Sequence, residues 1–263
     1  MRNTAVWKGT NMDEFMLFTQ DLAQASGDII RRYFRSGLEV ETKSDQSPVT
    51  IADRQVEEVM RRMIQNRYPQ HGILGEEFEA INPQAEYQWV LDPIDGTKTF
   101  ISGTYLFGTL IALLRDGKPI LGVINNPITD QFLIGDGQTT WLNGAPVRVR
   151  PCTSIEDATL LTTDWLDVHA YHNGQAFEDL ARRVRLRRTW GDCHGYFLVA
   201  TGYADIMIDA VMHVWDVAAL IPIIEGAGGR ITDYHGNDPM QGIGTIATAG
   251  VIHDQVLMAL NPD

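Results

Sequence analysis

Hydrophobic positions in the first seventy residues recur at helical spacing. Residues 13–36 carry an apolar side chain every three or four positions, at Phe15, Phe18, Leu22, Ala25, Ile29 and Tyr33. Such spacing is typical of one buried helix face. A second helix is predicted after Thr50 and before Pro69. Its inward residues are Val56, Val59, Met60 and Ile64, and its outward residues are Arg54, Glu57, Arg61 and Arg62.

The pattern then changes to short apolar runs separated by turn residues. The runs predict strands at residues 88–92, 106–114, 120–125 and 131–134. Turns at residues 115–118 and 126–129 join the last three strands, as in consecutive antiparallel strands. Residues 12–150 are therefore predicted to form helices packed on a largely antiparallel sheet.

Beyond residue 150, predicted strands and helices alternate. Strands are expected at residues 158–162, 185–188, 205–209 and 244–249, and helices at 173–183, 195–202, 214–226 and 253–260. This alternation indicates α/β layering in residues 151–263. The sequence contains no obvious linker, so we expect the two halves to form one compact unit.

Composition is that of a soluble globular protein, with 44% hydrophobic and 21% charged residues. No apolar run approaches the roughly 18–20 residues of a membrane-spanning helix. Residues 1–11 lack the apolar core of a secretory signal, and we expect a loose N-terminal arm there. The two cysteines, Cys152 and Cys193, suggest neither a disulfide framework nor a zinc site. These features fit a cytoplasmic protein.

The chain has a formal net charge of −13. Such a surface repels nucleic acid and anionic membranes, so neither is an expected partner. It also repels a phosphorylated small molecule unless bound cations reverse the local sign.

The most specific segment runs from Trp89 to Lys98 and reads WVLDPIDGTK. An apolar strand ends in Asp92, and Asp95 follows three residues later. Carboxylates so placed can converge on a hard cation such as Mg²⁺. The amides of Gly96 and Thr97, at a turn or helix start, would point at an anion. Taken alone, the segment could also be an ordinary Asp-rich turn with a helix cap.

Three further acidic sites occur in similar settings. Glu76 follows a short apolar run, Asp53 lies in the first turn of a predicted helix, and Asp216 begins another. Each by itself could be a helix cap or a solvated acid.

Together these motifs resemble the signatures of the inositol monophosphatase superfamily. The matching segments are Thr50-x-x-Asp53, Gly75-Glu-Glu77, Asp92-Pro-Ile-Asp-Gly-Thr97 and Trp215-Asp-Val-Ala-Ala219, the last continuing to Gly229. The resemblance covers residues 13–260. It implies the layered αβαβα sandwich that inositol monophosphatases share with fructose-1,6-bisphosphatase, a homodimer, and metal ions between the two halves.

The resemblance also implies roles for individual residues. Glu76, Asp92 and the Ile94 carbonyl would bind one Mg²⁺. Asp92, Asp95 and Asp216 would bind a second, and a weaker third ion would depend on Glu76 and water. The catalytic residues would be Thr97, Asp53 and Glu76, with Thr97 and Asp53 orienting and deprotonating the attacking water. The Gly96 and Thr97 amides would hold the phosphate, and lithium would inhibit by replacing a weakly held Mg²⁺.

The segments 188–196 and 207–216 resemble the histidinol-phosphatases of this superfamily. The resemblance implies L-histidinol phosphate, whose ammonium and imidazole could pair with Asp209 and Asp192, while Arg188 shapes the pocket. Arg188 and Asp192 could instead form a structural ion pair at a dimer interface. The three aromatic residues nearby are predicted to be core residues: Trp190, Tyr196 and Phe197.

The expected function is therefore Mg²⁺-dependent hydrolysis of a small phosphate ester. Histidinol phosphate is the leading substrate, and inositol 1-phosphate or a range of sugar phosphates are alternatives. No added basic patch supports a bisphosphorylated nucleotide. A metal- or phosphate-sensing protein without catalysis is the alternative outside enzymes, and the presence of every expected catalytic residue argues against it.

Overall fold

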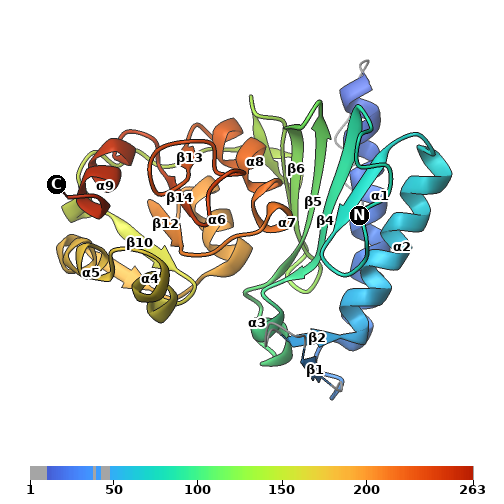
Figure 1. Cartoon of the computed structure of the whole chain (residues 1–263), viewed down its shortest axis with the longest axis horizontal. Coiled ribbons are helices and arrows are strands. Elements are labelled where there is room, and N and C mark those ends of the chain that lie inside the picture. The colour runs from blue at the N-terminus through green and yellow to red at the C-terminus, as the bar shows by residue number, and fades with distance from the viewer. Residues whose placement is uncertain (1–10, 38–39, 43–47, 263) are drawn as a thin grey trace.

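The computed structural model describes residues 11–37, 40–42 and 48–262. The proposed N-terminal arm, apart from Asn11, and Lys43, whose relation to the site the sequence left open, lie outside the described residues. Five layers alternate between helices and sheets (Figure 1). This confirms the αβαβα sandwich predicted from the sequence.

The first two layers are a pair of helices and a seven-stranded sheet. Helices α1 (Asn11–Tyr33) and α2 (Ile51–Arg67) cover one face of the sheet (Figure 1). Neighbouring strands are antiparallel except β3 and β4, which are parallel. The strands in spatial order are β3 (Gly72–Gly75), β4 (Tyr87–Asp95), β5 (Gly108–Arg115), β6 (Lys118–Asn126), β7 (Gln131–Gly135), β8 (Thr140–Leu142) and β9 (Ala145–Val147). The largely antiparallel sheet is therefore as predicted. A short hairpin of β1 (Val40–Thr42) and β2 (Pro48–Thr50) precedes α2.

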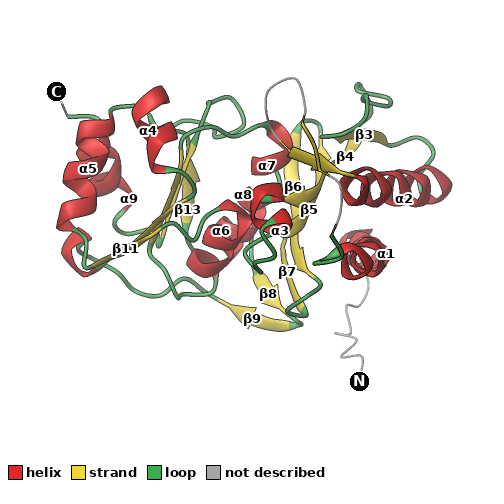
Figure 2. Ribbon diagram, turned by 90° about the horizontal axis from the view of Figure 1, so that it is seen from below, coloured by secondary structure: helices red, strands yellow, loops and turns green. Residues whose placement is uncertain are grey.

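The remaining layers belong to the second half of the chain. Between the two sheets lie α6 (Asp192–Ala200), α7 (Val214–Val217) and α8 (Leu220–Gly226). The second sheet has the order β11 (Leu186–Arg188), β10 (Thr159–Thr162), β12 (Ile206–Asp209), β14 (Thr245–Thr248) and β13 (Arg230–Thr232). Its outer face is covered by α4 (Trp165–Tyr171), α5 (Gly174–Arg183) and α9 (His253–Leu260), and the 3₁₀ helix η1 (Ile155–Asp157) leads into it (Figure 2).

Successive side chains of β4 point to opposite faces of the seven-stranded sheet and pack into two different hydrophobic cores. Trp89 and Leu91 point toward α1 and α2, where they pack with Val56 and Met60. Val90, between them, belongs to the core shared with α6 and α8. A strand covered on both faces is apolar at successive positions. Six consecutive residues of β4, from Trp89 to Ile94, are consequently buried.

The structure corrects several local predictions. The helix predicted over 214–226 is divided into α7 and α8, because Pro222 has no N–H to donate to the carbonyl of Ala218. Helix α4 and the short strands β8, β9 and β13 were not predicted. Trp190 is 43% exposed and is not a core residue, whereas Tyr196 and Phe197 are buried as predicted.

Two charged residues of α2 also differ from expectation. Glu57 and Arg61 were predicted to face outward, but their relative exposures are 0% and 7%. The two residues form an ion pair, so their opposite charges compensate each other inside the protein. None of the described helices has the length and apolar content needed to cross a membrane.

Candidate active site

Strand β4 delivers two carboxylates to one end of the central sheet. The pairing of β4 with β5 is regular up to Asp92 and resumes at Asp95, with an irregularity between them. Pro93 lies in this interval and cannot donate to the ladder. The Thr109 hydroxyl donates to the Pro93 carbonyl at 2.9 Å and fixes the distorted segment. The distortion lets both acids lie at the strand end.

Gly96 then turns the chain into the short helix α3 (Thr97–Ile101). Its φ of 85° lies in the left-handed region, which glycine adopts without strain. A Cβ at this position would also lie 2.8 Å from the Asp192 carboxylate. The sequence Asp95-Gly96-Thr97 therefore produces the predicted turn.

Helix α7 supplies the third carboxylate from the other half of the chain. The His213 N–H donates to Asp216 Oδ2 at 2.7 Å, which caps the helix and orients this acid. Asp92, Asp95 and Asp216 each offer an oxygen, and the three oxygens lie within 4.8 Å of one another. The structure thus brings together three of the predicted metal ligands.

The electrostatics of this cluster favour a bound cation. Burial raises the pKa of Asp92 well above its ordinary value, and the charges of Glu76, Asp95 and Asp216 raise it further. Burial likewise raises the pKa of Asp95, and that of Asp216 to about 7. Asp92 Oδ1 is buried without a hydrogen-bond partner. Converging oxygens, one of them unsatisfied, fit a hard divalent ion such as Mg²⁺.

Glu76 reaches the same cluster from the end of β3. Its backbone N–H donates to the Leu91 carbonyl at 3.2 Å, which ties it to β4. Its charge contributes to the raised pKa values of Asp53, Asp92 and Asp216. Glu76 is therefore close enough to interact electrostatically with Asp53, Asp92 and Asp216, and its role as a ligand stays a prediction.

Asp53 and Thr97 have other partners in this structure. Asp53 Oδ2 accepts from the Thr50 N–H at 2.8 Å and from the Thr50 hydroxyl at 2.6 Å, so Asp53 caps α2. Asp53 Oδ1 is buried without a partner, and burial raises the pKa of this carboxyl. The Thr97 hydroxyl donates to the Ile94 carbonyl at 3.1 Å. Among the described residues, Thr97 and Asp53 are not hydrogen-bonded to each other.

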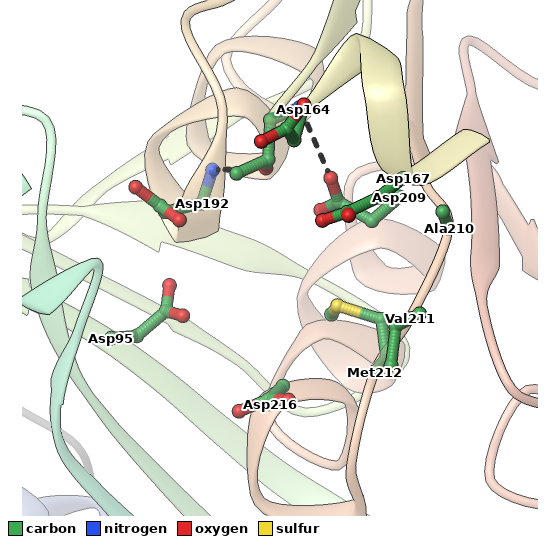
Figure 3. A pocket seen from close by; sticks show the side chains of 10 residues that line it. Asp95, Asp164, Asp167, Asp192, Asp209, Ala210, Val211, Met212 and Asp216 are labelled. Atoms are coloured by element: carbon green, nitrogen blue, oxygen red, sulfur yellow. Dashed lines mark hydrogen bonds between the residues drawn. The ribbon is translucent and has the colours of Figure 1, made fainter. Parts of the chain in front are cut away.

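A cavity of about 160 Å³ extends from Asp95 and Asp216 toward the second sheet. Figure 3 shows carboxylates surrounding this space from both halves of the chain. No lysine or arginine is among the described residues that line it. The lining residues are Asp95, Thr163, Asp164, Asp167, Asp192, Asp209, Ala210, Val211, Met212 and Asp216.

Two of the three predicted substrate-binding residues lie at this cavity. Asp209, at the end of β12, accepts from the Thr163 N–H at 3.2 Å, but its Oδ2 is buried without a partner. Burial raises the pKa of Asp209 to about 7. Asp192 begins α6 and accepts from the Thr99 hydroxyl at 2.9 Å. That bond joins the two halves of the chain beside the cavity-lining Asp192.

Arg188 lies elsewhere. It is exposed on the edge strand β11, donates to the Arg187 carbonyl at 2.7 Å, and its guanidinium lies 5.9 Å from the centre of the Trp190 ring. It does not line the cavity, and the described chain contains no ion pair between Arg188 and Asp192.

The sequence reasoning missed Thr163, Asp164 and Asp167. A signal for them was available, because two predicted strands end at Thr162 and Asp209. The corresponding strands β10 and β12 are parallel neighbours. Carboxyl ends of neighbouring parallel strands lie at the same edge of a sheet, where ligands commonly bind. Residues that follow Thr162 were therefore candidates for the same pocket as Asp209.

Comparisons with known proteins identify the family of this chain. The model of the inositol monophosphatase family matches residues 11–262. The plant bifunctional phosphatase IMPL2 of Arabidopsis thaliana is 44% identical over 86% of this chain, which spans 66% of that protein. A histidinol-phosphatase of Chlorobaculum parvum is 37% identical over 91% of this chain and 94% of its own length.

A solved structure supports the same assignment. The structure of an inositol monophosphatase from Zymomonas mobilis superposes with a TM-score of 0.86 and 36% identity, covering 96% of this chain and 99% of that one. The fold, the carboxylate cluster and these relatives point to the same family. The chain belongs to the inositol monophosphatase family and is a phosphoric monoester hydrolase.

Proposed function

We propose that this phosphatase hydrolyses a small phosphate monoester with a cationic alcohol as leaving group, most specifically L-histidinol phosphate to L-histidinol. One observation carries the proposal. The cavity beside the metal-binding cluster is lined by acids from both halves of the chain, and one of these acids, Asp209, is buried. A buried carboxylate of this kind is stabilised by a positively charged donor.

The metal site would hold two to three Mg²⁺ ions. Glu76, Asp92 and the Ile94 carbonyl would hold one ion, and Asp92, Asp95 and Asp216 another. Bound Mg²⁺ supplies an activated water and neutralises charge on the phosphate and leaving oxygens. It would also resolve the repulsion among the acids of this strongly negative chain.

The chain's own residues would position the reactants. The N–H groups of Gly96 and Thr97, at the turn from β4 into α3, would donate to phosphate oxygens. Asp53 has one oxygen fixed by Thr50 and one without a partner. With Thr97, it would orient the attacking water and accept its proton. The Thr97 hydroxyl would then accept from that water while donating to Asp53 in place of Ile94.

The outer cavity would recognise the leaving group. Asp209 and Asp192 would accept hydrogen bonds from the ammonium and imidazole of histidinol. The Chlorobaculum parvum relative bears the name of this activity and matches nearly the whole chain. Arg188 would contribute only if another protomer brought it to the cavity. We propose a homodimer, and light scattering tests this oligomeric state.

Inositol 1-phosphate is the second candidate, alone or within a range of sugar phosphates. The Zymomonas mobilis inositol monophosphatase is nearly as similar to this chain, and carboxylates also accept hydrogen bonds from neutral hydroxyl groups. The two candidates differ in the charge of the leaving group.

A comparison of kcat/KM for L-histidinol phosphate and inositol 1-phosphate, with Mg²⁺ and with EDTA, tests the proposal. We expect Mg²⁺-dependent release of phosphate from both, with the higher value for histidinol phosphate. A higher value for inositol 1-phosphate would overturn the substrate assignment. If neither ester released phosphate, a sensing role would be favoured.

A further inference from the structure

Helix α2 carries a buried ion pair one turn after Asp53. Arg61 Nε donates to Glu57 Oε1 at 2.6 Å, and the side chains are 9% and 0% exposed. It is the most deeply buried ion pair of the described chain. Burying two charges costs free energy unless their remaining hydrogen bonds are satisfied. The groups that form these remaining hydrogen bonds therefore indicate which part of the protein the ion pair holds in place.

Those partners are backbone groups of the loop that follows β3. Glu57 Oε2 accepts from the Glu77 N–H at 2.8 Å. Arg61 Nη2 donates to the Phe78 carbonyl at 2.8 Å, and Nη1 donates to the Glu79 carbonyl at 2.9 Å. Three consecutive residues of the loop, 77–79, are thus fastened to α2.

Gly75 shows how closely α2 approaches this loop. A Cβ on Gly75 would lie 2.0 Å from Glu57 Oε1. Any larger residue at the end of β3 would displace the Glu57 carboxylate. The position therefore requires glycine because of its neighbour.

Glu76 lies between the two fixed segments. On one side its own N–H donates to the Leu91 carbonyl of β4, and on the other the Glu57–Arg61 pair holds residues 77–79. A carboxylate on a loop is otherwise free to turn away from a cluster of like charges, and this double anchoring limits that movement.

We infer that Glu57 and Arg61 are positioning residues that hold Glu76 toward Asp92 and Asp216, and so set the affinity of the site for its divalent cations. The inference rests on the role of Glu76 as a metal ligand under the proposed function. Groups that orient metal ligands typically change metal affinity by roughly 10–100-fold when they are replaced.

Binding of Mn²⁺ alone to the metal-stripped full-length protein, followed by electron paramagnetic resonance, tests the inference. We expect Glu57→Gln to raise the Mn²⁺ Kd by about tenfold or more. We also expect a higher Mg²⁺ concentration for half-maximal activity, with kcat largely recovered at saturating Mg²⁺. Arg61→Lys, which keeps the charge but loses the forked donor, provides the same test if Glu57→Gln does not fold.

A double variant distinguishes positioning from general destabilisation. If Glu57 acts through Glu76, Glu57→Gln/Glu76→Gln binds Mn²⁺ no more weakly than Glu76→Gln alone. Additive losses of affinity in the double variant would overturn the inference.

Asp205→Asn is the matched control. Asp205 is 0% exposed, forms an ion pair with Arg150, and accepts from the Thr159 N–H at 2.6 Å. We expect this variant to lower Tm and to leave the Mn²⁺ Kd unchanged. Equal Mn²⁺ affinity in wild type and Glu57→Gln would overturn the inference alone, whereas a wild-type protein that binds no Mn²⁺ would overturn the proposed function.

Discussion

Acids occur both in the metal-binding cluster, called here the inner end of the site, and along the outer end of the cavity, but their surroundings differ. The inner carboxylates are Asp92, Asp95 and Asp216. The outer carboxylates are Asp164, Asp167, Asp192 and Asp209. The pKa of Asp92 is raised by burial and then by neighbouring carboxylates alone. The pKa values of Asp192 and Asp209 are raised chiefly by burial, and donors from Thr99 and Thr163 oppose the rise.

This difference separates two tasks. The inner carboxylates repel one another and are stabilised together by an added cation. Asp192 and Asp209 lie outside that cluster, and one donor from the protein, Thr99 or Thr163, holds each of them, so we expect these two acids to select a leaving group. We therefore expect replacements at the inner end to affect all substrates, and replacements at the outer end to affect substrates according to their charge.

Asp95→Asn should have the largest effect. Asparagine keeps the shape but removes a charged oxygen ligand, and the loss should exceed the effect of replacing a residue that merely orients a ligand. We expect Mg²⁺-dependent kcat/KM to fall by more than about 100-fold for both esters. Steady-state kinetics with circular dichroism as a check of folding provide the measurement.

Asp167→Asn is a suitable control for this variant, because Asp167 is exposed at the outer end of the cavity. Asp167→Asn should retain most activity toward an ester with a neutral alcohol as leaving group, such as inositol 1-phosphate. Wild-type rates in Asp95→Asn would show that the inner carboxylates are not the metal site.

Asp209→Asn should have a smaller and selective effect. Asparagine can still accept from the Thr163 N–H, but it cannot supply a negative charge to a cationic leaving group. We expect kcat/KM for histidinol phosphate to fall by about tenfold or more, the range for a lost hydrogen bond to a charged group. The value for inositol 1-phosphate should change less. An equal loss for both esters would contradict selection by charge at the outer end.

The sequence was most informative about the inner end. Asp92 and Asp95 lie at the end of an apolar strand, and the local motif of strand, proline and glycine showed that they could converge on a cation, although an ordinary Asp-rich turn remained an alternative until the further acidic motifs were considered. Asp216 could be joined to them only through the family resemblance, because its helix is distant in the chain. In the structure Asp92, Asp95 and Asp216 each offer an oxygen within 4.8 Å of the others, and their role as metal ligands stays a prediction.

The outer end was less predictable because it depends on how segments pack. Arg188 is close to Asp192 in sequence, yet it lies on an edge strand away from the cavity. Glu57 and Arg61 follow a polar helical pattern, and only the loop at residues 77–79 explains their burial. Charge in a sequence indicates solvent exposure only when no buried partner is available.

Inhibition by lithium should be a smaller effect than that of the substitutions, and it should report on the inner end. Under the proposed function, Li⁺ would replace a weakly held Mg²⁺ at the inner end, and no Mg²⁺ is proposed at the outer carboxylates. We expect partial inhibition at millimolar Li⁺ with both esters, measured at subsaturating Mg²⁺ with K⁺ as the control salt. Inhibition confined to histidinol phosphate would instead place the Li⁺ effect at the outer end.

The smallest effect concerns stability and pH. The pKa values of Asp209 and Asp216 are about 7 in the folded chain, above the ordinary value of 3.8. Between pH 4 and pH 7 the folded state therefore binds more protons than the unfolded state, and stability conferred by these groups falls as pH rises. We expect Tm in EDTA to decrease across this window and Mg²⁺ to restore it at pH 7.5, because the ion binds the deprotonated inner carboxylates. Each kcal/mol corresponds to roughly 2–4 °C for a chain of this size.

Asp216→Asn and Asp209→Asn assign this pH effect to the two ends. Each substitution removes one titrating group, so each should flatten the decrease of Tm in EDTA. Only Asp216→Asn should also reduce the recovery on adding Mg²⁺, because only Asp216 belongs to the inner carboxylates. A wild-type Tm in EDTA that rises from pH 5 to pH 7 would show that neither acid titrates near neutrality. Equal loss of Mg²⁺ recovery in both variants would show that the cation site extends into the outer end, and the two tasks would then share one set of acids.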